Sequence, residues 1–218
     1  ILDKTYSEDV ADYLPPKPND WSKPDKTRHI RADVLRFVLL KQVEHGEMTE
    51  SGTQLFGAQV TSSLNLNNAT IHTLFVLAAC RFEKAITADR SRSHSNVIFR
   101  YSSLPALSAA SASITAQLSC ECARLEAKSG NALNLQGTQI GGDVFLRNVI
   151  AASTVYINGA KIAGNLACKG ARFEATKGIA LNLQGAQIGD GFYFREVQAS
   201  KGLIDLSAAK SSKLVDDA

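Results

Sequence analysis

The sequence repeats itself, and this repetition limits the folds open to it more than any other feature does. Residues 132–141 read ALNLQGTQIG and residues 180–189 read ALNLQGAQIG, with one difference between them. A finer unit of about eleven residues lies inside both stretches. Its mostly apolar positions are 1, 3, 6 and 8, as in Leu133, Leu135, Thr138 and Ile140. Internal repeats are typical of solenoids, in which each repeat packs only on its neighbours.

The spacing within the unit predicts short strands joined by corners. Steps of two residues place side chains on one face of a strand. The step of three between positions 3 and 6 indicates a corner, next to a small residue at position 5. Two units then complete one turn of a four-sided coil. Because the unit recurs, more loosely, from Thr53 onward, we expect about seven coils in a β-solenoid over residues 53–209.

The segment before the repeat predicts a helix that caps the solenoid. Within residues 28–46, Ile30, Val34, Phe37 and Val38 lie at helical spacing, and Gly46 is a stop signal. An open solenoid end exposes unpaired backbone groups. We therefore expect the helix to cover the first coil.

The two ends of the chain differ from the repeat. Residues 1–27 contain four of the five prolines and favour an extended segment. Residues 210–218 lack the repeat pattern and predict a tail, with no cap at the far end. This uncovered C-terminal end is a candidate contact for a homo-oligomer. The insertions EAKSG (126–130) and EATKG (174–178) predict matching loops on one edge.

The repeat resembles two kinds of known protein. Its A-x-[LI]-x-x corners resemble those of pentapeptide-repeat β-helices, in which Ala and Leu point inward. The order WSKPDKTRHIRADVLRFVLL, GTQLFGAQV, LNLQGTQIGGDVFL and GNLACKGARFEA is more closely similar to a bacterial repeat family labelled oxidoreductase or membrane-associated oxidoreductase. The resemblance implies an all-β fold, a right-handed quadrilateral β-helix with an N-terminal α-helical cap.

Chemistry-bearing motifs are scarce. The chain has no G-x-G-x-x-G, P-loop, C-x-x-C or haem motif, so we expect no cofactor. The histidines form no HxxxH or HExxH pattern, and the cysteines are spread over the repeat, so we expect small buried thiols and no metal site. An enzyme would need outward carboxylates on neighbouring coils, and the candidates Asp143, Asp190 and Asp205 form no evident pair.

Composition narrows the partners and the compartment. The net charge of +3, from 24 basic and 21 acidic residues, does not favour specific nucleic-acid binding. Four cysteines are too few for a disulfide framework in 218 residues, which favours a reducing, cytoplasmic compartment. No apolar run has the length of a membrane span. Peripheral contact with a membrane surface remains an alternative.

Positions 2 and 4 of alternate units place apolar and basic side chains together on one outward face. We call this set the aromatic–basic face: Ile98, Arg100, Phe145, Arg147, Lys169, Tyr193 and Arg195. Exposed apolar residues beside arginines are typical of interaction surfaces, although a plain solvated edge has the same pattern. We expect a non-catalytic scaffold that binds a protein partner. Carbohydrate, an anionic membrane and single-stranded nucleic acid stay open as ligands, and a carbohydrate-active or other β-helix enzyme is the alternative function.

Overall fold

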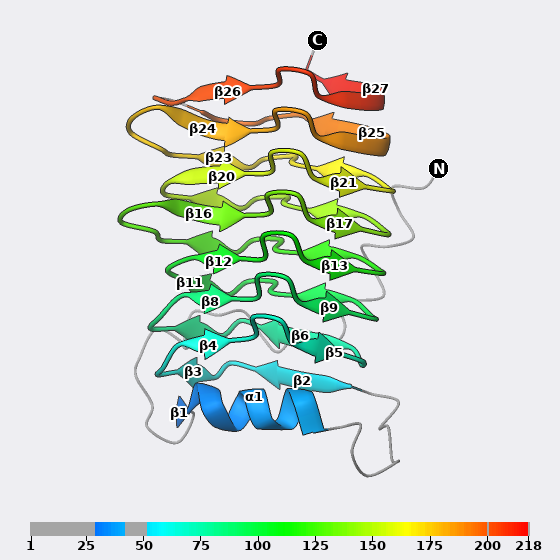
Figure 1. The fold of residues 1–218 in the computed structure, drawn as a ribbon. Helices are drawn as coiled ribbons and strands as arrows, with labels where there is room; N and C mark the ends of the chain where they lie inside the picture. Colours follow the sequence, from blue (N-terminus) through cyan, green and yellow to red (C-terminus); the bar gives the residue numbers. More distant parts are fainter. Residues whose placement is uncertain (1–28, 42–51, 200, 218) are drawn as a thin grey trace.

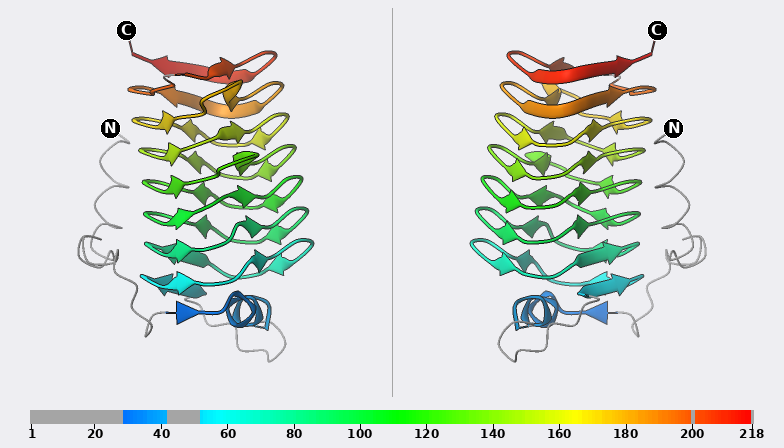
Figure 2. Two further views of the ribbon diagram at one scale, coloured as in Figure 1. Left: turned by 90° about the vertical axis from the view of Figure 1, so that its left-hand side faces the viewer. Right: turned by 90° about the vertical axis from the view of Figure 1, so that its right-hand side faces the viewer.

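The computed structural model describes residues 29–41, 52–199 and 201–217, and these form a four-sided parallel β-solenoid (Figure 1). About seven coils stack on one another, and one helix, α1 (Ala32–Lys41), lies at the N-terminal end (Figure 2). The predicted quadrilateral solenoid with an N-terminal cap is therefore confirmed. The predicted extended segment at residues 1–27 lies outside the described residues.

Two sides of the solenoid belong to one 13-stranded sheet, joined through the long strand β25 (Gln187–Phe194). The first side contains β2 (Thr53–Phe56), β6 (Phe75–Ala78), β10 (Val97–Ile98), β14 (Leu118–Ser119), β18 (Val144–Phe145), β22 (Leu166–Ala167) and the second half of β25. The fourth side contains β5 (Thr70–Ile71), β9 (Arg92–Ser93), β13 (Ser113–Ile114), β17 (Gln139–Ile140), β21 (Lys161–Ile162) and the first half of β25. The final strand, β27 (Lys210–Asp216), pairs with β25 on both sides.

The other two sides are seven-stranded sheets. The second side contains β1 (His29–Ile30), β3 (Gln59–Val60), β7 (Arg81–Phe82), β11 (Ser103–Leu104), β15 (Arg124–Leu125), β19 (Ile150–Ala151) and β23 (Arg172–Phe173). The third side contains β4 (Leu64–Asn65), β8 (Ile86–Thr87), β12 (Leu107–Ser108), β16 (Asn131–Asn134), β20 (Thr154–Tyr156), β24 (Ile179–Asn182) and β26 (Leu203–Asp205). The loops predicted at 126–130 and 174–178 precede β16 and β24, and project on the left in Figure 1.

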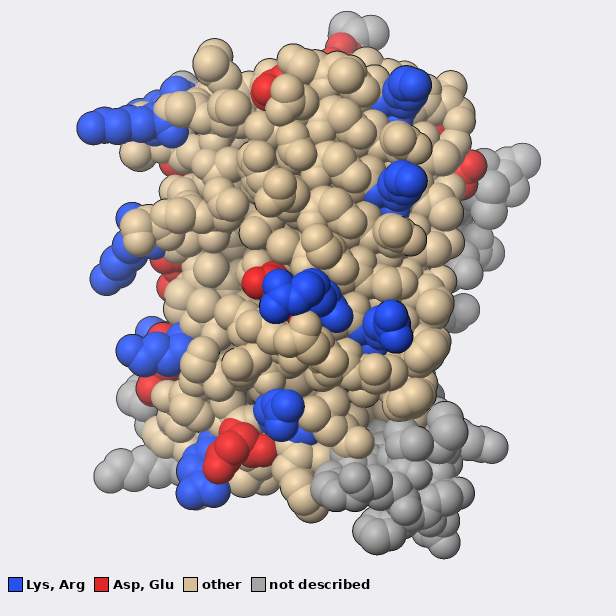
Figure 3. All heavy atoms as spheres, viewed as in Figure 1, with Lys and Arg blue, Asp and Glu red and all other residues tan. Residues whose placement is uncertain are grey.

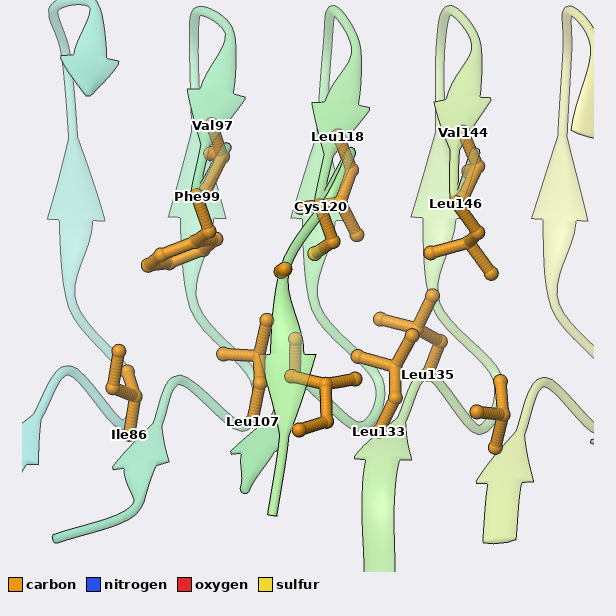
Figure 4. Packing of buried hydrophobic residues seen from close by; sticks show 14 of the residues in the cluster. Ile86, Val97, Phe99, Leu107, Leu118, Cys120, Leu133, Leu135, Val144 and Leu146 are labelled. Carbon is orange, nitrogen blue, oxygen red and sulfur yellow. The ribbon is translucent and has the colours of Figure 1, made fainter. Parts of the chain in front are cut away.

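The core is a narrow apolar column built from equivalent repeat positions. On the first side, Val97, Leu118 and Val144 pair in register from coil to coil, and all three are buried. Leu107 and Leu133 pair in the same way on the third side and point toward them across the interior (Figure 4). The inward assignment of positions 1 and 3 is thus confirmed.

The corner at position 5 has a left-handed backbone conformation in every unit of the described solenoid. Fourteen residues occupy it, with φ between 52° and 68°: Gly57, Asn68, Ala79, Arg90, Tyr101, Ser111, Cys122, Gly137, Asn148, Gly159, Gly170, Gly185, Glu196 and Ala208. Nine of the fourteen are not glycine. The conformation costs most non-glycine residues about 1–2 kcal/mol, so the stacked coils must compensate for this strain.

A side-chain hydrogen bond explains why the letters ALNLQG occur twice. The Asn134 carboxamide oxygen accepts a hydrogen bond from the backbone N–H of Gln136 at 3.1 Å, just before the left-handed Gly137. The Asn182 oxygen accepts from Gln184 N–H at 2.9 Å in the same way. Asn is favoured in such turns because its side chain bonds the backbone two residues on. The motif is therefore a corner that recurs two coils later.

The N-terminal end of the core is covered by α1. Leu35 and Leu39 of the helix are buried against the first coil. Next to these leucines, Arg36 Nε donates a hydrogen bond to the backbone oxygen of Asn65 in β4 at 2.8 Å. Burial of these two leucines removes apolar surface from water and closes the edge at which parallel strands would otherwise end.

The helix is shorter than predicted. Residues His29–Ile30, placed in the helix at 28–46 from the sequence, form strand β1 and pair with β3 in the second side. The helix then begins at Ala32 and extends to Lys41. Residues 42–46, with the predicted stop at Gly46, lie outside the described residues. A two-residue strand leaves no periodic pattern, so sequence spacing assigned it to the adjoining helix.

The C-terminal end also differs from the prediction. Residues Lys210–Asp216, predicted as part of a tail at 210–218, form β27 on top of β25. Leu214 is 59% exposed, whereas its paired residue Phe192 in the coil below is 4% exposed. The last described coil thus leaves inward apolar positions uncovered. The homo-oligomer contact expected at this end stays a prediction.

Substitution of Gly159 tests the left-handed corner. This residue has φ of +62°, and an added Cβ would meet no atom within 4 Å, so only backbone strain separates the variants. We expect Gly159→Asn to change the free energy of unfolding by less than about 0.5 kcal/mol, since asparagine fills the same corner at Asn68 and Asn148. Gly159→Val should cost about 2 kcal/mol. Urea unfolding measures both, and equal costs would contradict the assigned conformation.

Candidate interaction face

All seven residues of the aromatic–basic face lie on the first side of the solenoid. Ile98, Phe145 and Tyr193 take the outward positions of β10, β18 and β25, in one register that passes through Ser119 and Ala167. The four basic residues each lie two positions after such an outward position, and backbone hydrogen bonds align them from coil to coil. The structure therefore brings the predicted set into one continuous strip.

The apolar members of the strip are exposed to different degrees. Tyr193 is 37% exposed, whereas Ile98 and Phe145 are only partly accessible. Ala167 lies between Phe145 and Tyr193 in the register and is buried. The strip consequently presents two aromatic rings separated by one small residue, rather than an unbroken apolar row.

Glu121 binds the two arginines in the middle of the strip. Its carboxylate lies 3.1 Å from Arg100 Nε and 3.6 Å from Arg147 Nε, and its side chain is 15% exposed. Arg100 Nε is buried and makes no hydrogen bond, so its contact with Glu121 is an ion pair of poor hydrogen-bond geometry. Arg147 also stacks on Phe145, with Cζ 4.7 Å from the ring centroid. These contacts hold both arginines in place.

The charge on the face is lower than a row of free basic side chains would give. Glu121 compensates part of the charge of Arg100 and Arg147. Lys169 Nζ lies 3.8 Å from the Glu196 carboxylate, and both side chains are more than half exposed. Arg195 has no ion-pair partner within the described part of the chain. Glu196 was not predicted because it occupies the corner at position 5, outside the outward positions 2 and 4 that define the face.

Removal of the Glu121 carboxylate should destabilise the fold more than removal of an exposed one. Glu121→Gln leaves Arg100, whose side chain is 20% exposed, without its partner, and we expect a loss of about 1–2 kcal/mol. Glu126→Gln is the matched control, because the Arg124–Glu126 pair is more than half exposed, and it should cost less than about 0.5 kcal/mol. Urea unfolding at low and high salt measures both. Equal losses in the free energy of unfolding would show that the ion pairs of Glu121 contribute no more than an exposed surface pair does.

Three of the four cysteines are buried, as expected from the sequence, whereas Cys122 is only half-buried. Cys80, Cys120 and Cys168 are buried inside the column, and all four cysteines are free thiols. Burial raises the pKa of Cys80 to about 11 and that of Cys120 to about 12, and it also raises the pKa of Cys168. Desolvation raises the pKa of the half-buried Cys122 as well. Thiolate formation, on which cysteine reactivity depends, is therefore disfavoured at all four positions.

Alkylation tests this arrangement. With iodoacetamide at pH 7.5, Cys122 should react first, and more slowly than a free thiol, because it is the one cysteine that is not fully buried. Cys80, Cys120 and Cys168 should react only after unfolding in guanidinium chloride. Peptide mass spectrometry measures each site. Modification of any of these three as fast as Cys122 in the native protein would contradict the inward assignment.

Two of the three carboxylates considered for catalysis, those of Asp143 and Asp205, accept hydrogen bonds from backbone N–H groups. Asp143 Oδ1 accepts hydrogen bonds from the backbone N–H of Asn165 at 2.6 Å and from its Nδ2 at 3.0 Å. Asp205 Oδ1 accepts from Ser207 N–H, and hydrogen bonds from Ser207 lower the pKa of Asp205. Asp205 therefore acts as a turn acceptor, whereas Asp143 joins its own coil to the next. The enzyme alternative stays a prediction.

Across residues 29–41, 52–199 and 201–217, no group of three or more His, Cys, Asp or Glu residues has the arrangement of a metal site. No helix among the described residues is long and apolar enough to cross a bilayer. No family of known proteins, no curated protein and no solved structure matches the chain. The oxidoreductase label of the similar bacterial family therefore gains no support from these comparisons.

Proposed function

We propose that the chain is a non-catalytic β-solenoid that presents the aromatic–basic face to a protein partner. The observation that supports this proposal is the fixed position of Arg147, stacked on Phe145 and paired with Glu121. Arginine and tyrosine are enriched among the residues that dominate binding energies. A side chain that is already held in place loses less conformational freedom on binding.

The face indicates the chemistry of the partner. Tyr193 is the most exposed ring of the strip, and Arg195 has no ion-pair partner among the described residues. A complementary surface would place carboxylates opposite Arg195 and Lys169 and an apolar group against Tyr193. Electrostatic complementarity of this kind sets specificity and association rate more than affinity. The partner is thus expected to carry an acidic rim around an apolar patch.

Two substitutions at the exposed end of the face test the proposal. Tyr193→Ala with Arg195→Ala removes side chains that the described fold does not use in ion pairs, so the variant should keep its far-ultraviolet circular dichroism. A protein retained from native lysate by the unmodified chain should then be purified and titrated. Its dissociation constant should rise about 30-fold or more with the double variant, as expected for the loss of a tyrosine and an arginine that contact the partner.

The matched control lies on the opposite edge. Lys128→Gln with Lys177→Gln changes two exposed lysines in the 126–130 and 174–178 loops, and this variant should bind the purified partner within about twofold of the unmodified chain. A partner that binds both double variants equally well would place the interaction elsewhere and overturn the proposal.

A further inference from the structure

A second surface feature lies on the fourth side of the solenoid, which adjoins the first side through β25. A groove of about 710 Å³ runs across β13, β17, β21, β25 and β27. It spans five successive coils, so its length along the solenoid axis is about 19 Å. Binding sites for small ligands have volumes of this order, but the groove is long and open, a shape that suits an extended chain.

One wall of the groove is a row of hydrogen-bonding side chains. Ser113, Gln139, Lys161, Gln187 and Lys210 pair in register on consecutive coils and point outward. Adjacent members are therefore about 4.8 Å apart along the axis. The two lysines alternate with the two glutamines, which places the ammonium groups two coils apart.

The floor of the groove consists of small residues. Gly141, Ala163 and Gly189 lie on consecutive coils, each two residues after a member of this row, and all three are exposed. A Cβ at Gly141 would lie 2.3 Å from the Thr115 carbonyl oxygen, and one at Gly189 would lie 2.1 Å from that of Ala163. Close approach of the coils thus excludes larger side chains at the two glycines. The resulting low floor leaves space beside the lysines.

The groove is electropositive. Lys161 and Lys210 have no ion-pair partner among the described residues, and no aspartate or glutamate lines the groove. In Figure 3 separate basic side chains follow one another down the right-hand part of the surface, over the strands of the fourth side. Unpaired lysines in a hollow that lacks carboxylates favour an anionic ligand.

The chemistry of the lining residues selects among anionic polymers. No aromatic residue lines the groove, so nucleic-acid bases would lack the stacking platforms on which single strands depend. The backbone groups of β13, β17 and β21 are used between coils, so they cannot pair with the backbone of an extended peptide. Amides, hydroxyls and ammonium groups remain, and these match the hydroxyl and carboxylate groups of an acidic glycan.

We propose that this groove binds an extended β-1,4-linked acidic glycan along the solenoid axis. The rise per sugar of such a chain is close to the coil spacing of about 4.8 Å. Its alternate sugars face the same way, so every second carboxylate meets a lysine, Lys161 or Lys210, and Gln139 and Gln187 bind hydroxyl groups between them. About four sugars fit the length of the groove. This site lies on a different side from the aromatic–basic face and does not depend on the protein-binding proposal.

Isothermal titration with defined oligosaccharides tests the site. The probes are a hexamer of β-1,4-linked mannuronate and cellohexaose, which has the same linkage without carboxylates. At low ionic strength the mannuronate hexamer should bind at least tenfold more tightly than cellohexaose. Lys161→Gln with Lys210→Gln, which extends the existing glutamine row, should weaken the mannuronate complex roughly tenfold through loss of two exposed ion pairs.

Two further variants keep the test specific. Lys128→Gln with Lys177→Gln removes the same charge outside the groove and should leave mannuronate affinity within about twofold. Ala163→Phe fills the floor without a change in charge and should weaken binding as much as the lysine variant does, with unchanged circular dichroism. The proposal is overturned if the hexamer does not bind at millimolar concentration, if both lysine double variants behave alike, or if oligothymidylate or oligoglutamate binds more tightly than mannuronate.

Discussion

The structure depends on the backbone hydrogen bonds that join each coil to the next. Leu135 N–H donates to the Tyr156 carbonyl and Leu183 N–H to the Asp205 carbonyl, both at 2.7 Å, and the same bond recurs around the solenoid. Most strands contain two residues, so no coil buries a face by itself. The ladder fixes the register, and a slip of one residue would turn the inward leucines to solvent. The apolar column and the surface rows both follow from this register.

Much of the fold was predictable because the repeat units share apolar residues at the inward positions 1 and 3. Leu and Val residues at positions 1 and 3 are buried in the middle coils, as at Leu133 and Leu135, whereas Leu55 in the first coil is partly buried and Leu206 near the C-terminal end is exposed. The end strands β1 and β27 were not predictable, since they lack that pattern. In β27 the residue paired with the buried Ile188 is Ser211, so the sequence favoured a tail. This strand is identified by its backbone pairing with β25, which the hydrophobic pattern of the sequence does not reveal.

The two surfaces differ in how far the sequence reveals them. The aromatic–basic face could be grouped from repeat positions, but the pairing of Glu121 with both arginines depends on side-chain geometry between coils. The groove was missed because its members are not evenly spaced. Gln139 and Lys161 are 22 residues apart, whereas Lys161 and Gln187 are 26 apart, because the loop at 174–178 lengthens one coil. Only the register of the strands aligns them.

The measurement that tests the coil stacking most directly is the distance between spin labels on one side of the solenoid. Cys122→Gly removes the partly exposed thiol and suits the left-handed corner. Labels at cysteines replacing Arg92 and Gln187, four coils apart on the fourth side, should be separated by about 19 Å. Moving the first label from Arg92 to Thr70 should add about 4.8 Å. Both distance distributions should be narrow, and their mean distances should differ by one coil spacing. Broad distributions, or the same mean distance for both label pairs, would contradict the stacked-coil structure.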